Sequence, residues 1–149
     1  MPLGTYQHAT YGKVVITHDL LHQRFNATGA RAGGAGGHLA YEIEGSSFIV
    51  HSVDTTPVGT GLGPVLMEVA VSWALSQDLS MTEARTVSLP SYDFYAAVGF
   101  APDATEQANI AAVPALAARG LQAATWRGDS ARILIGSHSR YNGRWTFLG

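Results

Sequence analysis

The sequence predicts a single mixed α/β (α+β) domain built on one central sheet. Its 149 residues are 46% hydrophobic and only 13% charged, which is enough apolar surface for one domain with a buried core. Runs rich in β-branched and aromatic residues alternate along the chain with runs whose apolar residues recur at helical spacing. A glycine-rich turn leads from a predicted strand into the most regular helix, so sheet and helix pack as neighbouring layers.

Composition excludes several classes of protein. The chain has no cysteine, which excludes a disulfide scaffold, a thiolate zinc site and a cysteine nucleophile. The formal net charge of −2 gives no reason to expect a nucleic-acid partner. Of the six histidines, His18 and His22 have helical i, i+4 spacing, but no third ligand is nearby, so we expect no metal site.

Membrane and secretion signals are not evident. No apolar stretch reaches the roughly 18 to 20 residues of a membrane helix. The first residues lack the apolar core of a signal peptide. We therefore expect a cytoplasmic protein with no membrane partner and one domain over residues 1–149.

The first third of the chain predicts a strand, a helix and a loop. Val14–Ile16 is a β-branched run typical of a short strand. We expect a short helix over His18–Phe25, because its apolar residues share a face and Asp19 suits a helix start. Five glycines between Gly29 and Gly37 disfavour regular structure and predict a surface loop, which lacks the GK[ST] ending of a P-loop.

The middle of the chain predicts a hairpin followed by a helix. His38–Glu44 alternates apolar and polar residues, residues 45–47 form a turn, and Phe48–Asp54 is a second strand. A turn rich in Gly, Thr and Pro follows over Thr55–Gly63. Pro64–Leu75 is the clearest helix, with apolar residues at helical spacing and proline in the first turn.

Shorter elements follow. We expect a strand over Arg85–Leu89 and a short helix over Asp93–Val98, closed by Gly99. The alanine-rich segment Thr105–Ala124 predicts a helix interrupted by its proline and a glycine.

The last residues predict a hairpin. Strand-like runs at Ile133–Ile135 and Trp145–Phe147 flank Asn142 and Gly143. Asn-Gly between such runs is a strong hairpin signal.

The turn before the main helix carries the chemical signal. Gly59, Gly61 and Gly63 alternate with single residues where a strand meets a helix. Backbone N–H groups of such a turn can converge on one point with the positive end of the helix dipole behind them, which suits a pyrophosphate. The spacing is not that of a Rossmann fingerprint. A glycine-rich turn without a ligand stays open as an alternative.

Two stretches together resemble the GNAT superfamily of acyl-CoA-dependent N-acetyltransferases. The first is VDTTPVGTGLG (residues 53–63) and the second is FYAAVGF (residues 94–100). Members of the family show V-x-P-x-x-R/Q-G-x-G-I/L-G/A from a strand into a helix, and F/L-Y-x-x-x-G-F further along. Here Thr55 stands at the proline position and Val58 at the Arg or Gln position. The resemblance covers residues 39–100.

This resemblance implies a fold and a cofactor. The fold is a central mixed, mostly antiparallel sheet flanked by helices, and the co-substrate is acetyl-CoA. In the family the chain runs from G-F straight into its last two strands, whereas Ala101–Ser130 precede the hairpin predicted here. Either a helix is inserted or this hairpin is not the last pair of the family.

The resemblance also implies residue roles. The backbone of Val53 and Thr55 pairs with the pantetheine arm, the strands carrying Val53 and Val87 splay apart to admit it, and Tyr95 is the general acid toward the leaving thiolate. The pyrophosphate is held by the backbone amides of Val58, Gly59, Thr60, Gly61, Leu62 and Gly63. The alternative for Tyr95 is a core tyrosine.

The acceptor amine must lose a proton before it attacks. His51, Asp54 and Glu44 are the candidate bases, and imidazole titrates nearest to pH 7. Each has a structural alternative: a strand histidine bonded to its neighbour, a carboxylate that caps a turn, and a solvated glutamate at a hairpin end.

The resemblance implies an acetyltransferase acting by direct attack in a ternary complex. Its acceptor is an amine-bearing small molecule or a protein, and a homodimer is left open. The alternatives are a catalytically lapsed module that binds CoA or a protein, and a toxin or effector that acetylates a macromolecule.

Overall fold

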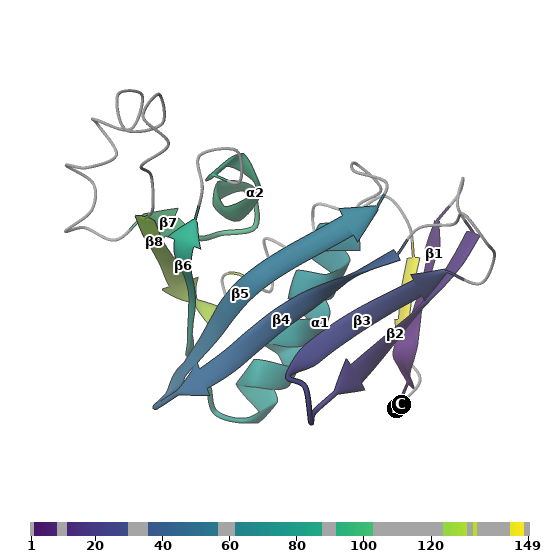
Figure 1. Cartoon of the computed structure of the whole chain (residues 1–149), viewed down its shortest axis with the longest axis horizontal. Helices are drawn as coiled ribbons and strands as arrows, with labels where there is room; N and C mark the ends of the chain where they lie inside the picture. The colour runs from purple at the N-terminus through teal and green to yellow at the C-terminus, as the bar shows by residue number, and fades with distance from the viewer. Residues whose placement is uncertain are drawn as a thin grey trace.

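A computed structural model describes residues 2–8, 12–29, 36–56, 62–87, 92–102, 124–130, 133 and 144–147. Its strands are β1 (Pro2–His8), β2 (Gly12–Asp19), β3 (Arg24–Gly29), β4 (Gly36–Glu44), β5 (Ser47–Thr56), β6 (Met81–Val87), β7 (Ala101–Pro102), β8 (Ala124–Asp129) and β9 (Arg144–Phe147). Its helices are α1 (Leu62–Ser76) and α2 (Tyr92–Ala97). The strands form one sheet in the order β7-β8-β6-β5-β4-β3-β2-β1-β9 (Figure 1).

The sheet is mixed and mostly antiparallel, as predicted. Among the described strands, β5 and β6 pair in parallel and the other neighbouring pairs are antiparallel. The parallel pair is connected through α1, because strands that run in the same direction need a crossover between them. The predicted hairpin (β4 and β5) and the predicted main helix (α1) are both confirmed.

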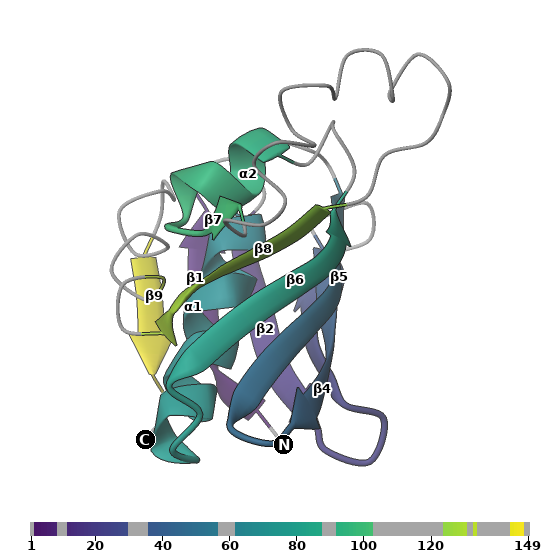
Figure 2. The same ribbon diagram turned by 90° about the vertical axis from the view of Figure 1, so that its left-hand side faces the viewer.

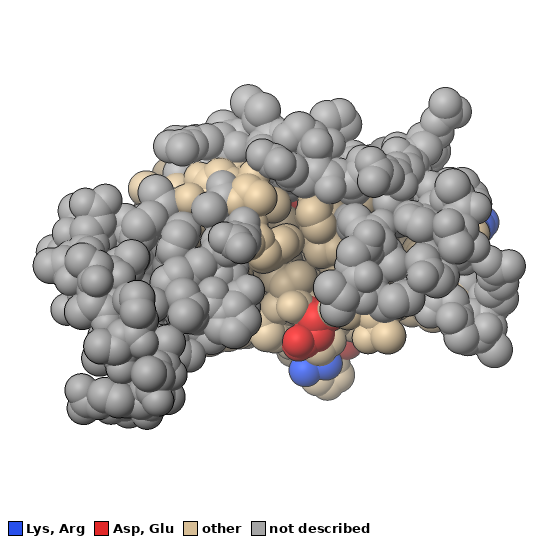
Figure 3. All heavy atoms as spheres, turned by 90° about the horizontal axis from the view of Figure 1, so that it is seen from above, with Lys and Arg blue, Asp and Glu red and all other residues tan. Residues whose placement is uncertain are grey.

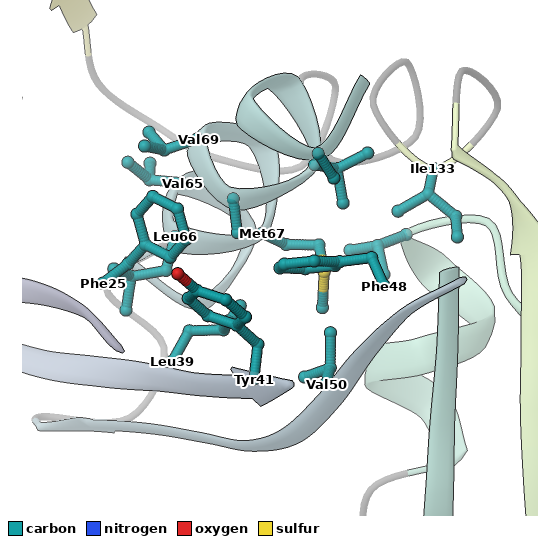
Figure 4. Close-up of a cluster of buried hydrophobic side chains, with 14 of the residues drawn as sticks. Phe25, Leu39, Tyr41, Phe48, Val50, Val65, Leu66, Met67, Val69 and Ile133 are labelled. Carbon is teal, nitrogen blue, oxygen red and sulfur yellow. The ribbon is translucent and has the colours of Figure 1, made fainter. Parts of the chain in front are cut away.

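The core lies between the sheet and α1. Two perpendicular views show α1 against one face of the sheet, which curls around it (Figures 1 and 2). Alternate residues of β4 and β5 point at this helix, among them Leu39, Tyr41 and Phe48, and meet Leu66 and Met67 (Figure 4). Burying a side chain of this size contributes about 1.5–3 kcal/mol, so this layer holds the sheet on the helix.

One extra residue interrupts the β4–β5 ladder. Ala40 lies opposite Ser52, whereas Tyr41 lies opposite Val50, so His51 has no partner of its own in β4. A bulge of this kind bends a strand and redirects the side chain at the bulge. On both sides of the bulge the same face of the two strands packs against α1, because Leu39 on one side and Val50 on the other are both buried in the core.

The helix predicted over His18–Phe25 is wrong. β2 continues to Asp19, residues 20–23 form a turn, and β3 begins at Arg24. The two leucines that suggested an apolar helix face, Leu20 and Leu21, are 65% and 86% exposed. They bury too little surface to stabilise a helix, whereas alternate residues of both strands reach the core. The carboxylate of Asp19 instead accepts a hydrogen bond from the His22 amide (3.2 Å) within the turn.

The predicted strand at Arg85–Leu89 begins earlier than expected. β6 starts at Met81, and residues 88–89 lie outside the described residues. A buried hydroxyl pair holds its first half: Thr82 Oγ1 and Ser130 Oγ are 2.8 Å apart. Ser130 Oγ also donates to the carbonyl of Leu79 (2.9 Å), and its amide donates to the carbonyl of Ser80 (2.8 Å). These bonds satisfy polar groups that would be costly to bury alone.

Three described strands follow Phe100. β7 begins at Ala101, and β8 lies between β7 and β6. Most of the predicted terminal hairpin and of the segment before it lies outside the described residues. β9 contains the predicted strand Trp145–Phe147, and it pairs with β1 at the far edge of the sheet. Residues 134–135 lie outside the described residues, and Ile133 is a buried core residue rather than part of a described strand.

Two further predictions fall largely on residues outside the description. Of the glycine loop, residues 30–35 are not described, whereas Gly29 ends β3 and Gly36 begins β4. Of the alanine-rich helix predicted over Thr105–Ala124, the last residue begins β8 and the others are not described. Within the described ranges, neither helix has the length and apolar character needed to cross a bilayer.

Candidate functional site

The parallel strands β5 and β6 separate at one end of the sheet. They pair from Ser47 opposite Met81 to Val50 opposite Ala84. Both strands then continue, β5 to Thr56 and β6 to Val87, without further pairing to each other. Figure 1 shows the two strands diverging toward their carboxyl ends. The splay predicted for the strands carrying Val53 and Val87 is therefore present, and along it β5 presents backbone groups to an added extended chain.

His51 lies where the splay begins. It is the bulge residue of β5 and follows Val50, the last residue paired with β6. Its side chain is half-exposed, and its Nε2 atom lies 3.3 Å from Oε1 of Glu42 on β4. A histidine that is both accessible and held by a carboxylate suits proton transfer better than a histidine buried in the core.

Asp54 lies further along the same strand. Its exposed carboxylate is 3.5 Å from Nε2 of His38 on β4. The backbones of the two strands meet closely there, because a Cβ added to Gly37 would overlap the carbonyl oxygen of Asp54 and lie 2.9 Å from Cα of Thr55. Glycine at position 37 thus lets β4 support β5 beside the splay.

The third candidate base lies elsewhere. Glu44 is opposite Ser47 at the hairpin end of β4, away from the splay. Its side chain is exposed. This position at the hairpin end argues against a role in proton transfer.

The start of α1 faces α2. Leu62 and Gly63 are the first two residues of α1 and both are buried. A Cβ added to Gly63 would lie 3.1 Å from the Phe94 ring, so glycine permits the close contact between the helices. Val58, Gly59, Thr60 and Gly61 lie outside the described residues, and their expected contact with a pyrophosphate stays a prediction.

Tyr95 is fixed by the end of α2. Gly99 has φ 107°, a conformation that favours glycine. The Phe100 amide then donates to the Tyr95 carbonyl (2.9 Å), and the two rings contact edge to face with centroids 5.1 Å apart. This helix ending is a Schellman arrangement, and it explains physically why the stretch FYAAVGF ends in Gly-Phe.

The phenol of Tyr95 is strongly biased toward its neutral form. Its side chain is 7% exposed and belongs to the core cluster. Burial, with a smaller contribution from the negative charge of Asp54, raises the pKa of Tyr95 to about 12. The hydroxyl therefore keeps its proton throughout the physiological range.

The end of the sheet where β5 and β6 part is seen from above in Figure 3. The part of this face that is described is mainly neither acidic nor basic, and Asp or Glu atoms lie beside Lys or Arg atoms at the front edge. In the residues that the structure describes, no group of three or more His, Cys, Asp or Glu side chains is placed to hold a metal ion.

Sequence reasoning did not identify the carboxylate partner of His51. The alternation in HLAYEIE puts Glu42 and Glu44 on the same face of the strand, but it cannot say which of them reaches His51. The contact is a diagonal one, because Glu42 lies opposite Ile49, two residues before His51. The pairing of His38 with Asp54 was missed because the bulge at His51 shifts the register beyond it by one residue.

Comparison with known proteins gives structural similarity only. No family model matches the sequence, and no curated protein matches it. The structure is similar to that of nourseothricin acetyltransferase, with 17% identity, 87% of this chain and 84% of that chain covered, and a TM-score of 0.52. An acetyltransferase from Bacillus subtilis in complex with CoA has 13% identity, coverage of 71% and 75%, and a TM-score of 0.49. At these identities the first similarity establishes the fold, which is GNAT-like.

Proposed function

We propose that this protein is an acetyl-CoA-dependent N-acetyltransferase that acetylates a primary amine by direct attack in a ternary complex. The observation that carries the proposal is the splay between β5 and β6 beyond Val50 and Ala84. It opens next to an accessible histidine, His51. α2, which packs Phe94 against Gly63 at the start of α1, also carries the buried, protonated phenol of Tyr95. The GNAT-like fold supports the same conclusion.

The residues along the splay fit a long cofactor with an amide-containing arm and a diphosphate. The stretch of β5 from His51 to Thr56 has backbone groups without partners in β6, and Val53 and Thr55 are the proposed partners of the arm. At the other end, α1 begins at Leu62, and the positive end of its dipole suits an anion. Since Val58 carries no charge, the diphosphate is held by backbone amides.

Acetyl-CoA supplies the acetyl group as an activated thioester. His51 accepts the proton that the amine loses as the new N–C bond forms. Tyr95 donates its hydroxyl proton toward the sulfur as the C–S bond breaks. The proton held by His51 then passes to solvent, and solvent returns one proton to the Tyr95 oxygen, which restores both residues. Most of the rate acceleration comes from holding the amine and the thioester side by side, because a reaction between two bound groups replaces a bimolecular encounter in solution.

We assign the base role to His51 rather than to Asp54. His51 lies at the first unpaired position of the splay, whereas Asp54 lies three residues further and is paired with His38. Asp54 instead acts on Tyr95 through its charge, which helps to keep the phenol protonated.

The acceptor is proposed only as a class. The name of nourseothricin acetyltransferase identifies a small-molecule acceptor for that protein, and an amine-bearing small molecule is therefore the first class to test here. A protein acceptor is the second, because β2 and β3 are joined by the short turn of residues 20–23 rather than by a helix that would cover the sheet.

The test combines binding and turnover. Acetyl-CoA is titrated calorimetrically, and thiol release is then followed with a panel of small amines and lysine peptides. We expect binding with turnover, and a loss of roughly 100-fold in kcat for Tyr95→Phe, in the range of acid–base contributions, with acetyl-CoA affinity retained. Tyr41→Phe is the matched control, since this buried tyrosine bonds His18 (2.6 Å) away from the splay.

Each outcome separates the candidate functions. Binding without turnover for any amine would favour a CoA-binding module that has lost catalysis. Absence of acetyl-CoA binding would overturn the proposal.

A further inference from the structure

We infer that Glu42 is a positioning residue, which holds His51 so that the acceptor amine is deprotonated on the face of the sheet opposite α1. The inference rests on the proposed function, because it deepens the role of His51. It stands on the contact between Glu42 and His51 and on the position of both residues in the β4–β5 ladder.

The strand pattern places Glu42 on the face away from the helix. Its neighbours Leu39 and Tyr41 belong to the core cluster on α1. Successive side chains of a strand alternate between faces, so the side chain of Glu42 projects from the opposite face. It is partly exposed there, with 42% of the side chain accessible.

His51 reaches this carboxylate diagonally across the ladder. Glu42 lies opposite Ile49, two residues before His51, so the side chains of Glu42 and His51 project from the same face. Nε2 of His51 lies 3.3 Å from Oε1 of Glu42. His51 also follows the last β5–β6 pair, so the contact places the imidazole beside the opening.

The contact has a defined chemical consequence. A carboxylate beside Nε2 favours the tautomer with hydrogen on Nε2, which leaves the Nδ1 lone pair free to accept a proton. The amine can then transfer its proton to Nδ1 while the contact with Glu42 keeps the ring oriented. The proton then passes to solvent, because the His51 side chain is 53% accessible. Glu42 touches neither the amine nor the thioester in this scheme.

The experiment compares Glu42→Gln with Glu44→Gln. Both variants remove one negative charge from the same face of β4, but Glu44 lies at the hairpin end away from the splay. The first readout is the tautomer of His51 from its ring nitrogen NMR signals, in the free protein at a pH where the ring is neutral. We expect hydrogen on Nε2 in the wild type and in Glu44→Gln, and a mixture of tautomers in Glu42→Gln.

The second readout is steady-state thiol release. We expect kcat to fall roughly tenfold to 100-fold in Glu42→Gln, with KM for acetyl-CoA unchanged, because the base is misplaced while the cofactor site is intact. Glu42→Asp should recover part of the loss, since it restores the carboxylate. Glu44→Gln should match the wild type.

The two readouts separate failure of the inference from failure of the proposed function. An unchanged His51 tautomer in Glu42→Gln would overturn the inference, whether or not the protein is active. An unchanged kcat in Glu42→Gln, in an enzyme that His51→Ala inactivates, would overturn it as well. If no amine is acetylated by the wild type, the proposed function fails, and the tautomer comparison still decides whether Glu42 holds His51.

Discussion

The buried phenol of Tyr95 makes stability depend on pH in a way that can be calculated. The pKa of Tyr95 is raised to about 12 by burial and, to a smaller extent, by the charge of Asp54, from an ordinary value of 10.0. Between those values the unfolded chain releases the proton and the folded protein keeps it. The stabilisation is therefore complete below pH 10 and is lost as the pH rises toward 12. At about 1.4 kcal/mol for each pKa unit, the full loss is about 2.7 kcal/mol.

Urea unfolding of the wild type and of Tyr95→Phe at pH 8 and pH 11 tests this calculation. The variant has no hydroxyl to ionise at position 95, and the other five of the six tyrosines are present in both proteins. Between the two pH values the wild type should lose about 1.4 kcal/mol more of its free energy of unfolding than the variant does. Equal losses would refute the reasoning, because they would mean that water reaches the phenol in the folded state.

Three substitutions test other parts of the structure by their free energies of unfolding. Gly37→Ala should cost more than about 2 kcal/mol, because the added methyl group meets the backbone of β5 and neither strand can yield; a cost under 0.5 kcal/mol would contradict the close approach. Asp78→Gly should stabilise the protein by about 0.5–1 kcal/mol, since Asp78 has φ 61° after α1; destabilisation would indicate that its side chain contributes more than the backbone strain removes. Ser130→Ala should cost about 1–3 kcal/mol, because the Thr82 hydroxyl and the Leu79 carbonyl each lose a buried partner; an unchanged midpoint would show that water replaces the hydroxyl.

Regular periodicity over a long enough segment made part of the fold predictable. β4 alternates over His38–Glu44, and α1 repeats its apolar residues over four turns, so both elements follow from local sequence. The segment His18–Phe25 is too short for its periodicity to distinguish a helix from strands. Its apolar residues divide between a strand, an exposed turn and another strand, and only the pairing of β2 with β3 distinguishes them. Long-range pairing also determines the position of β9 beside β1.

The candidate site was predictable to the level of its strands but not of its contacts. The splay of the strands carrying Val53 and Val87 was implied by the resemblance and is present. The burial of Tyr95 agrees with the core tyrosine that was left open as the alternative to a general acid. The pairing of His38 with Asp54 was not predictable, because the bulge at His51 adds one residue to β5 and shifts every pair beyond it. No local pattern in β5 marks His51 as that residue.

The hydroxyl pair of Thr82 and Ser130 has a consequence for ligand entry. The four residue pairs that join β5 to β6 close one end of a wedge whose two arms already stand apart, and the hydroxyl pair fixes β6 to the residue that follows β8. Because β5 and β6 are already separated, no hydrogen bonds between them have to break when a ligand binds. Little of the free energy of binding is therefore spent on deforming the protein. We would therefore expect association to be fast and to follow a single exponential, with selectivity determined mainly by dissociation.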